Sequence, residues 1–320
     1  MAQFAELSIP LSSSNFLAMF HRLRVTILIL LAAVSVPVVV RSQGHVNAVY
    51  QREVEKFRAA EIKDLKSNWL VLAGLFWPKP GANSFGTAAD NSIVLPAGTA
   101  PAKAGVFELN GDEVTLRMEP GVAATIDNQP VTTAKLQPDT SGKATVVALG
   151  RLRMHVIKRG QRVGIRLKDL QNPALRNFTA LQFYPIDPAY RITANWVPSD
   201  GKRKINVTNV LGDVTPTIVP GEARFTLNGE RLKLTALSGD PAKGLFFVFS
   251  DATGKTDTYP AGRFLETDAV EDGTVVLDFN KAYNPPCAFT PYATCPLAPK
   301  ENRLGIAIPA GEKFEHNKLH

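Results

Sequence analysis

The chain has 320 residues, of which 45% are hydrophobic and 20% charged, and its formal net charge is +7. These proportions are typical of a globular protein that buries a core. The positive charge is too mild to indicate a nucleic-acid partner, and the sequence holds no P-loop, no dinucleotide fingerprint and no basic patch with interleaved aromatic residues. We therefore expect no nucleic acid and no cofactor.

Residues 1–42 are predicted to form an N-terminal extension and a signal peptide, the signal itself spanning residues 19–42. Arg22 and Arg24 precede an apolar run from Val25 to Val40, and Ser42 supplies a small residue at the cleavage position. Positive, apolar and small segments in this order are typical of a secretory signal, and Met19 is then the expected start. The apolar run is short for a membrane span. We expect an exported protein, periplasmic or extracellular, with no stable span after cleavage; a retained N-terminal membrane anchor is the alternative.

Residues 45–66 have the spacing of one amphipathic helix. Its apolar stripe consists of Val46, Tyr50, Val54, Phe57 and Leu65. The remaining positions carry charges of both signs, which favours packing against the rest of the protein over lying on a membrane surface.

From Asn68 onward the pattern changes to short strands. Trp69 to Leu72 reads as a buried strand. Hairpins are predicted around Asn110-Gly111, Arg159-Gly160 and Asn228-Gly229, because glycine after asparagine or arginine suits a tight turn between alternating segments. Further strands are expected at residues 245–249 and 274–279.

The fold class is therefore mainly β, with an N-terminal amphipathic helix followed by two β-sandwich or barrel-like units. We place the first β domain at residues 68–165 and the second at 166–313.

Histidine and cysteine are too scarce for most catalytic or metal sites. His155 is the only histidine away from the chain ends, so neither a Ser–His–Asp triad nor a metal site is predicted. Cys287 and Cys295 lie eight residues apart in a proline-rich stretch, and in an exported chain they are expected to form a disulfide. A reactive thiol pair is the alternative.

The C-terminal segment is the densest polar cluster and the best candidate for a site. It carries Asp278, Asn280, Tyr283, Asn284, Tyr292, Glu301 and Asn302. Arg263, just upstream, has the planar fork that binds carboxylate or phosphate with two hydrogen bonds. The alternative is that these groups satisfy one another and the backbone of the loop.

A second cluster is formed by Arg166, Asp169, Arg176, Asp187 and Arg191. Arg–Asp networks of this kind are often structural, which is the interpretation we favour. Arg166 also belongs to the basic face of the hairpin around Gly160, which could meet an anionic glycan or lipid, although a solvated face is the plainer interpretation.

The run LDFNKAYNPPCAFTPYATCPLAPKENRLGIAIPAGEK at 277–313, with WLVLAGLFWPKPGANSFGTAADNSIVLP at 69–96 and DTYPAGRFL at 257–265, closely resembles the family called domain of unknown function 1684. The family has no established activity, so the resemblance implies no mechanism.

Residues 85–95 resemble the opening of a forkhead-associated β-sandwich in a weaker way. Those domains read phosphothreonine through an arginine after the glycine and a later serine and histidine. Here Thr87 follows Gly86, and the stretch from Ala97 to Val106 has neither serine nor histidine. The resemblance therefore implies the fold without phosphopeptide binding.

Two functions remain. The first is an exported protein that binds a small molecule, glycan or envelope component through Arg263, Asp278, Asn280, Tyr283, Asn284 and Asn302. The second is a hydrolase-like enzyme in which Asp278 or Glu301 acts as acid and base and Arg263 holds an anionic substrate. A thiol redox role for the cysteine pair is a third, weaker hypothesis.

Overall fold

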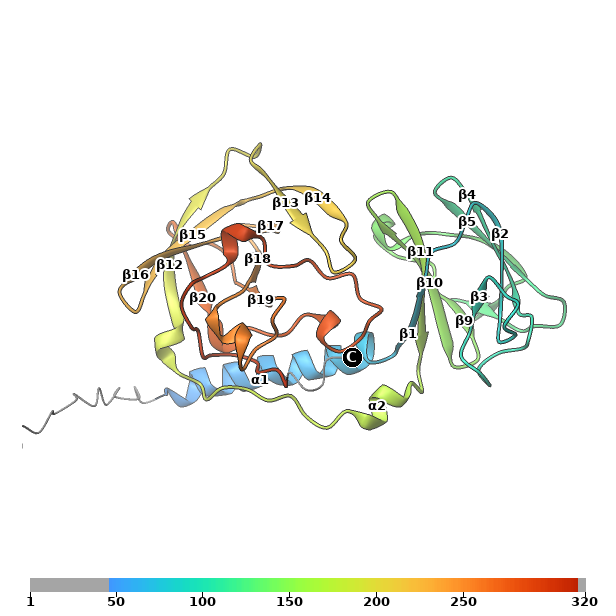
Figure 1. Ribbon diagram of the computed structural model, residues 1–320, viewed down its shortest axis with the longest axis horizontal. Helices are drawn as coiled ribbons and strands as arrows, with labels where there is room; N and C mark the ends of the chain where they lie inside the picture. The colour runs from blue at the N-terminus through green and yellow to red at the C-terminus, as the bar shows by residue number, and fades with distance from the viewer. Residues whose placement is uncertain (1–45, 316–320) are drawn as a thin grey trace, which may run out of the picture. The chain divides into compact units, whose positions relative to one another are not determined.

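The computed structural model describes residues 46–315 (Figure 1). The predicted signal peptide lies outside these residues. Among the described helices, none combines the length and the apolar character that crossing a bilayer requires.

The N-terminal helix α1 spans Ala48–Asp64, inside the predicted range 45–66. It begins there because the Asn47 side chain accepts a hydrogen bond from the Val49 N–H at 2.8 Å, which caps the first turn. The helix continues into a π-helical turn at Leu65–Trp69. The strand predicted from Trp69 is therefore wrong in its start: Trp69 closes the π turn, and the first strand begins at Leu72.

Two sheets form the first β unit. A six-stranded sheet in the order β1-β11-β10-β9-β6-β7 consists of β1 (Leu72–Phe76), β6 (Thr125–Ile126), β7 (Gln129–Pro130), β9 (Val147–Leu149), β10 (Leu152–Arg159) and β11 (Arg162–Asp169). A five-stranded sheet in the order β3-β2-β4-β5-β8 consists of β2 (Gly81–Gly86), β3 (Ile93–Val94), β4 (Gly105–Asn110), β5 (Glu113–Met118) and β8 (Thr133–Leu136). Both sheets contribute to one apolar core, in which the Phe85 and Phe107 rings stack with centroids 4.5 Å apart.

The hairpin β10–β11 has the two faces predicted from its alternation. Met154 pairs with Leu167 and Val156 with Ile165, and all four lie in the core. His155 pairs with Arg166 on the opposite face. β11 crosses the boundary that we placed between residues 165 and 166, because its pairing with β10 continues to Asp169. The last strand of this sheet therefore ends at Asp169, while the division into two domains stays a prediction.

The second β unit contains three smaller sheets. Their orders are β16-β15-β12-β20, β17-β18-β19 and β13-β14. The strands are β12 (Arg191–Pro198), β13 (Lys204–Thr208), β14 (Val214–Ile218), β15 (Gly221–Leu227), β16 (Glu230–Thr235), β17 (Ser238–Asp240), β18 (Gly244–Phe249), β19 (Arg263–Glu266) and β20 (Thr274–Asp278). The predicted turn between β15 and β16 is confirmed, with φ of 53° at Asn228 and 82° at Gly229, as a tight hairpin requires.

Long irregular segments complete this unit. Between β11 and β12 the chain forms one short helix, α2 (Pro173–Asn177), and the segment after β20 contains single 3₁₀ turns at Phe279–Lys281, Pro286–Ala288 and Lys300–Asn302. The end of the described chain returns to both segments: the Glu312 N–H donates to the Ala282 carbonyl at 2.8 Å, and Glu312 forms an antiparallel bridge with Phe183. Gly311 has a φ of 78°, and a Cβ there would lie 2.5 Å from the Ala282 oxygen, so this crossing needs glycine.

Candidate functional site

A buried carboxylate and a buried amide meet where the chain end crosses the loop after β20. The Glu312 carboxylate accepts hydrogen bonds from the backbone N–H and the side-chain amide of Asn284, both at 2.8 Å. The same amide also donates to the Lys313 carbonyl at 2.9 Å. Glu312 is 2% exposed and Asn284 4% exposed. Within residues 46–315 the Asn284 Oδ1 atom has no hydrogen-bond partner, although it is buried.

This pair lies in the wall of a cavity of about 520 Å³. The cavity is lined by Leu70, Ala174, Asn177, Phe178, Thr179, Ala180, Leu181, Gln182, Asn284, Ala288, Phe289, Glu312, Lys313, Phe314 and Glu315. A second, smaller cavity of about 30 Å³ shares Asn284, Phe289 and Glu312 with the first and reaches Glu61 and Trp69. An apolar, concave space of this size with few polar groups is typical of small-molecule sites.

The acids around these cavities hold their protons more tightly than usual. Burial raises the pKa of Glu312 to about 8, against the opposing effect of the two Asn284 N–H groups. Burial also raises the pKa of Glu61 to about 7, and the nearby carboxylates of Glu266 and Asp64 raise it further. The cavities are therefore bordered by weakly acidic carboxyls and by Asn284, whose covered Oδ1 atom lacks a hydrogen-bond donor, and this setting suits a ligand that donates hydrogen bonds.

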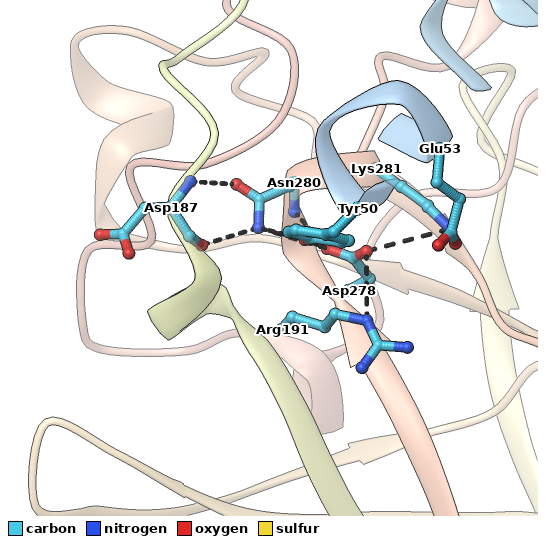
Figure 2. Close-up of polar contacts among 7 residues, drawn as sticks. All are labelled: Tyr50, Glu53, Asp187, Arg191, Asp278, Asn280 and Lys281. Atoms are coloured by element: carbon cyan, nitrogen blue, oxygen red, sulfur yellow. Dashed lines mark hydrogen bonds and ion pairs between the residues drawn. The ribbon is translucent and has the colours of Figure 1, made fainter. Parts of the chain in front are cut away.

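Asp278 and Asn280 form a separate cluster with α1 (Figure 2). The Tyr50 hydroxyl donates to Asp278 Oδ1 at 2.8 Å and accepts from the Asn280 side-chain amide at 2.9 Å. Asn280 also bonds both backbone groups of Asp187, donating to its carbonyl at 2.8 Å and accepting from its N–H at 2.9 Å. Asp278 caps the following 3₁₀ turn through the Asn280 N–H at 3.2 Å.

The second oxygen of Asp278 faces two cations. Oδ2 lies 4.0 Å from Arg191 Nε and 3.9 Å from Lys281 Nζ, and no described residue donates a hydrogen bond to it. Lys281 also bonds Glu53 on α1 (Figure 2). The pKa of Tyr50 is raised, first by burial and then by its bond to Asp278. These contacts attach α1 to β12 and β20.

Arg263 is fully buried, and both terminal nitrogens of its guanidinium are bound, whereas Nε has no hydrogen-bond partner among the described residues. It is 1% exposed, its guanidinium forms an ion pair with Asp251 at 2.6 Å, and it donates to the carbonyls of Ile308, at 3.0 Å, and Ala310. Asp251 also accepts from the Ile308 N–H at 3.1 Å. Arg263 thus ties the C-terminal segment to β19, and its charge is neutralised inside the protein.

The remaining candidates also lie apart from one another. Asn302, 0% exposed, links β16 and β18 through the Thr235 backbone and the Val248 carbonyl. Tyr283 donates to Glu266 at 2.8 Å. Glu301 lies half-buried in a 3₁₀ turn. The structure thus brings Asp278 to Asn280, places Asn284 at the cavity, and puts Arg263 and Asn302 in separate structural positions.

Cys287 and Cys295 are close but not bonded to each other. The Cys287 N–H donates to the Cys295 sulfur at 3.3 Å. The hydrogen bond between the thiols lowers the pKa of Cys287 and raises the pKa of Cys295. Burial raises the pKa of Cys295 further. The disulfide stays a prediction.

Residues 176–313 match the model of the family described as "Protein of unknown function (DUF1684)". This part of the chain belongs to that family. A solution structure of an uncharacterized protein from Haloarcula marismortui is 29% identical, with a TM-score of 0.38, and the match covers 45% of this chain and 82% of that one. No curated protein matches the chain.

Two solved forkhead-associated domains are also similar. One comes from a study of phosphothreonine-dependent FHA domain interactions, and the other is the FhaA FHA domain. Each is 18% identical with a TM-score of 0.21; the matches cover 28% and 29% of this chain and 79% and 96% of those domains.

Sequence reasoning missed Glu312, Glu61 and Tyr50. Glu312 stands in the quoted run at 277–313, directly after a glycine, but nothing local marks it as buried. A glycine before a charged residue at the end of an apolar run was the one available signal, since it permits the close backbone crossing at Gly311. The sequence places Tyr50 on the apolar stripe of α1. That placement does not predict the hydrogen bonds of its hydroxyl to Asp278 and Asn280.

Proposed function

We propose that the protein binds a small molecule with an apolar body and a hydrogen-bond-donating head, in the cavity walled by Asn284 and Glu312. The observation that carries this proposal is Asn284, which lines a cavity of about 520 Å³ and whose Oδ1 atom is a covered acceptor without a partner among the described residues. An unsatisfied buried acceptor costs about 1–3 kcal/mol, which a donor on a ligand would recover where the cavity wall moves to uncover this oxygen.

The head group should be an alcohol or an amine. Glu312 borders both cavities and Glu61 borders the smaller one, so a carboxylate ligand would add a further acid beside them. The body should be aliphatic or aromatic, since Phe178, Leu181 and Phe289 line the larger cavity.

Three ligands with one body and different heads test this proposal. We expect decanol and decylamine to bind the purified protein in isothermal titration, and decanoate to bind at least about tenfold more weakly, the effect of one lost hydrogen bond and one repulsion. Equal binding of all three, or of none, would contradict the proposal.

A matched pair of tryptophan variants locates the binding. Ala180 is exposed at the cavity rim, so Ala180→Trp fills the space without disturbing the core. Ala242 is equally exposed in the turn between β17 and β18, away from the cavity. Ala180→Trp should abolish decanol binding and Ala242→Trp should leave it intact.

The hydrolase alternative has less support in the geometry. Arg263 is bound by Asp251 and two carbonyls and is 1% exposed, so holding an anionic substrate would require it to leave its partners. No contact joins Arg263 to Asp278 or Glu301 among the described residues.

We also propose that the chain is exported and that export oxidises Cys287 and Cys295. The support is the order of charged, apolar and small residues at 19–42, together with the short distance between the Cys287 nitrogen and the Cys295 sulfur. N-terminal sequencing of the exported protein should find a start near Gln43. Mass spectrometry without reduction should find the cysteines joined, and two free thiols would rule out the disulfide.

A further inference from the structure

Arg166 is a buried cation in the middle of the first β unit. It stands on β11 and pairs with His155 on β10 and Leu75 on β1, so strands on both sides fix its backbone. The residue is only 7% exposed. Its guanidinium lies 5.8 Å from the centre of the Trp69 ring.

No anion neutralises Arg166 within residues 46–315. No ion pair and no hydrogen bond joins its guanidinium to any described residue, and Nε is both fully covered and unpartnered. The terminal nitrogens are not among the fully covered atoms, so they keep access from outside. The predicted network with Asp169 is not formed: Asp169 pairs with Arg151 at 2.8 Å instead. Nor is this part of the hairpin face solvated, as the plainer interpretation of the sequence had it.

The charged groups that act on Arg166 have opposing effects. Arg159 lowers its pKa, whereas Asp139 and Cys295 raise it, and Arg166 in turn lowers the pKa of Lys168. Asp139 is already bound by Arg159 at 2.7 Å and by the Lys158 N–H at 3.0 Å. Burial first, and then Arg159, lower the pKa of Arg166 to about 10, so it is charged at neutral pH.

The C-terminal segment also contacts this hairpin. The Arg159 Nε–H donates to the Thr294 hydroxyl at 3.1 Å, and the neighbouring Cys295 is 6% exposed. Because Arg166 itself is only 7% exposed, a compact anion fits it better than an extended membrane surface.

We propose that the basic face of the β10–β11 hairpin binds a compact oxyanion of the phosphate or sulfate type at Arg166. The planar guanidinium offers two parallel N–H donors to such an anion, and Lys168 and Arg159 add positive charge. The site uses residues far in sequence from Gly86 and Thr87, and it is independent of the cavity at Glu312.

Binding of phosphate to the full chain, compared with chloride at equal ionic strength, tests this site. Inorganic phosphate should bind the wild type and raise its unfolding midpoint, because a ligand that binds only the folded state stabilises it. A second measurement compares the affinity of phenyl phosphate with that of inorganic phosphate. If phenyl phosphate binds more tightly, the natural ligand is an oxyanion carried by a larger molecule. If it binds more weakly, the natural ligand is a free anion.

Two variants on the same strand separate a site from general charge. Arg166→Met should weaken phosphate binding at least about tenfold, as expected for losing charge-assisted hydrogen bonds. Arg162→Met removes an exposed arginine that pairs with Asp213, and should change binding by less than about twofold. Equal loss in both variants, or no preference of the wild type for phosphate over chloride, overturns the proposal.

His155 gives a readout that needs no substitution. Its pKa is lowered to about 4, mainly by burial and then by the positive charges of Arg166 and Lys168. Arg159 also lowers this pKa, whereas Asp139 raises it. An anion at Arg166 cancels part of this positive charge, so the pKa of His155 should rise in phosphate relative to chloride. An NMR titration of the imidazole measures it, and an unchanged pKa with phosphate bound places the anion elsewhere.

Discussion

Arg263 and Arg166 are both buried arginines on strands, and they differ in what surrounds the guanidinium. Arg263 meets a carboxylate and two carbonyls that belong to the protein itself. Arg166 lies beside an aromatic ring and forms no ion pair among residues 46–315. A buried charge keeps its place at a folding cost unless something pairs with it. The first arginine is therefore part of the architecture, whereas the second is a site.

Glu312 lies between these extremes. Its carboxyl accepts two N–H groups from Asn284, and no cation among residues 46–315 forms an ion pair with it. The raised pKa expresses this incomplete compensation. The three buried groups thus differ in how far the protein neutralises them. Arg263 is paired and structural, Glu312 tends to keep its proton in the cavity wall, and Arg166 is left to bind an anion.

The largest effect should come from breaking the Arg263–Asp251 pair. Arg263→Met leaves the Asp251 carboxylate buried and unpaired, and should lower the free energy of unfolding by about 3–5 kcal/mol. Urea denaturation measures it. A loss under about 1 kcal/mol would mean that Arg263 is not structural and would reopen its role in binding.

The Glu312→Gln variant should change how stability depends on pH. Because the pKa of Glu312 in the folded state, about 8, lies above its ordinary value of 4.5, the folded protein binds the proton more tightly than the unfolded chain. The stabilisation is complete below pH 4.5 and is lost as the pH rises through 8. The wild type should lose about 4–5 kcal/mol as the pH rises through this window.

The pH dependence must be separated from that of nearby groups. Glu61 acts in the same direction, since its pKa is raised to about 7. Comparing urea midpoints at pH 5 and pH 8 for the wild type, Glu312→Gln and Glu61→Gln assigns the slope. An unchanged slope in Glu312→Gln would show that its carboxyl ionises freely.

The sequence predicted what depends on neighbouring residues. The alternation in β10 and β11 sorts apolar from basic side chains correctly, because successive residues of a strand face opposite sides. Asn228-Gly229 marks the β15–β16 turn because both residues tolerate a positive φ. The helix likewise lies inside the range 45–66 that its apolar spacing predicts, although its cap at Asn47 is no part of that prediction.

Long-range partners could not be predicted in this way. Tyr50 and Asp278 are 228 positions apart, and Asn302 meets Thr235 across 67. The sequence predicts one site from six polar candidates between residues 263 and 302, yet their side chains bind different partners in the structure. The cavity needed Glu312 and the segment 174–182 to come together, and no local pattern encodes that meeting.

Removing the Tyr50 hydroxyl should have a moderate effect on stability. Tyr50→Phe takes away a 2.8 Å hydrogen bond to a buried carboxylate, and should cost about 1.5–2 kcal/mol in thermal or urea unfolding. Glu53 lies on the same helix as Tyr50 and forms a partly exposed ion pair with Lys281. Glu53→Gln removes this ion pair and should cost less than about 1 kcal/mol. Equal costs would mean that α1 is held by surface charge and not by the buried cluster.

The smallest change in stability should follow Arg166→Met in buffer without phosphate or sulfate. Methionine fills similar space beside Trp69 and removes a charge that no described residue neutralises, so the free energy of unfolding should change by less than about 1 kcal/mol or increase. The same substitution at Arg263 is expected to cost several times more, which makes the two variants a direct test of the contrast between them. If Arg166→Met were as damaging as Arg263→Met without any anion present, the surrounding protein would itself be compensating the charge, and the anion site would lose its physical basis. If it is neutral without phosphate but removes the stabilisation that phosphate gives the wild type, the guanidinium is held in place for its ligand.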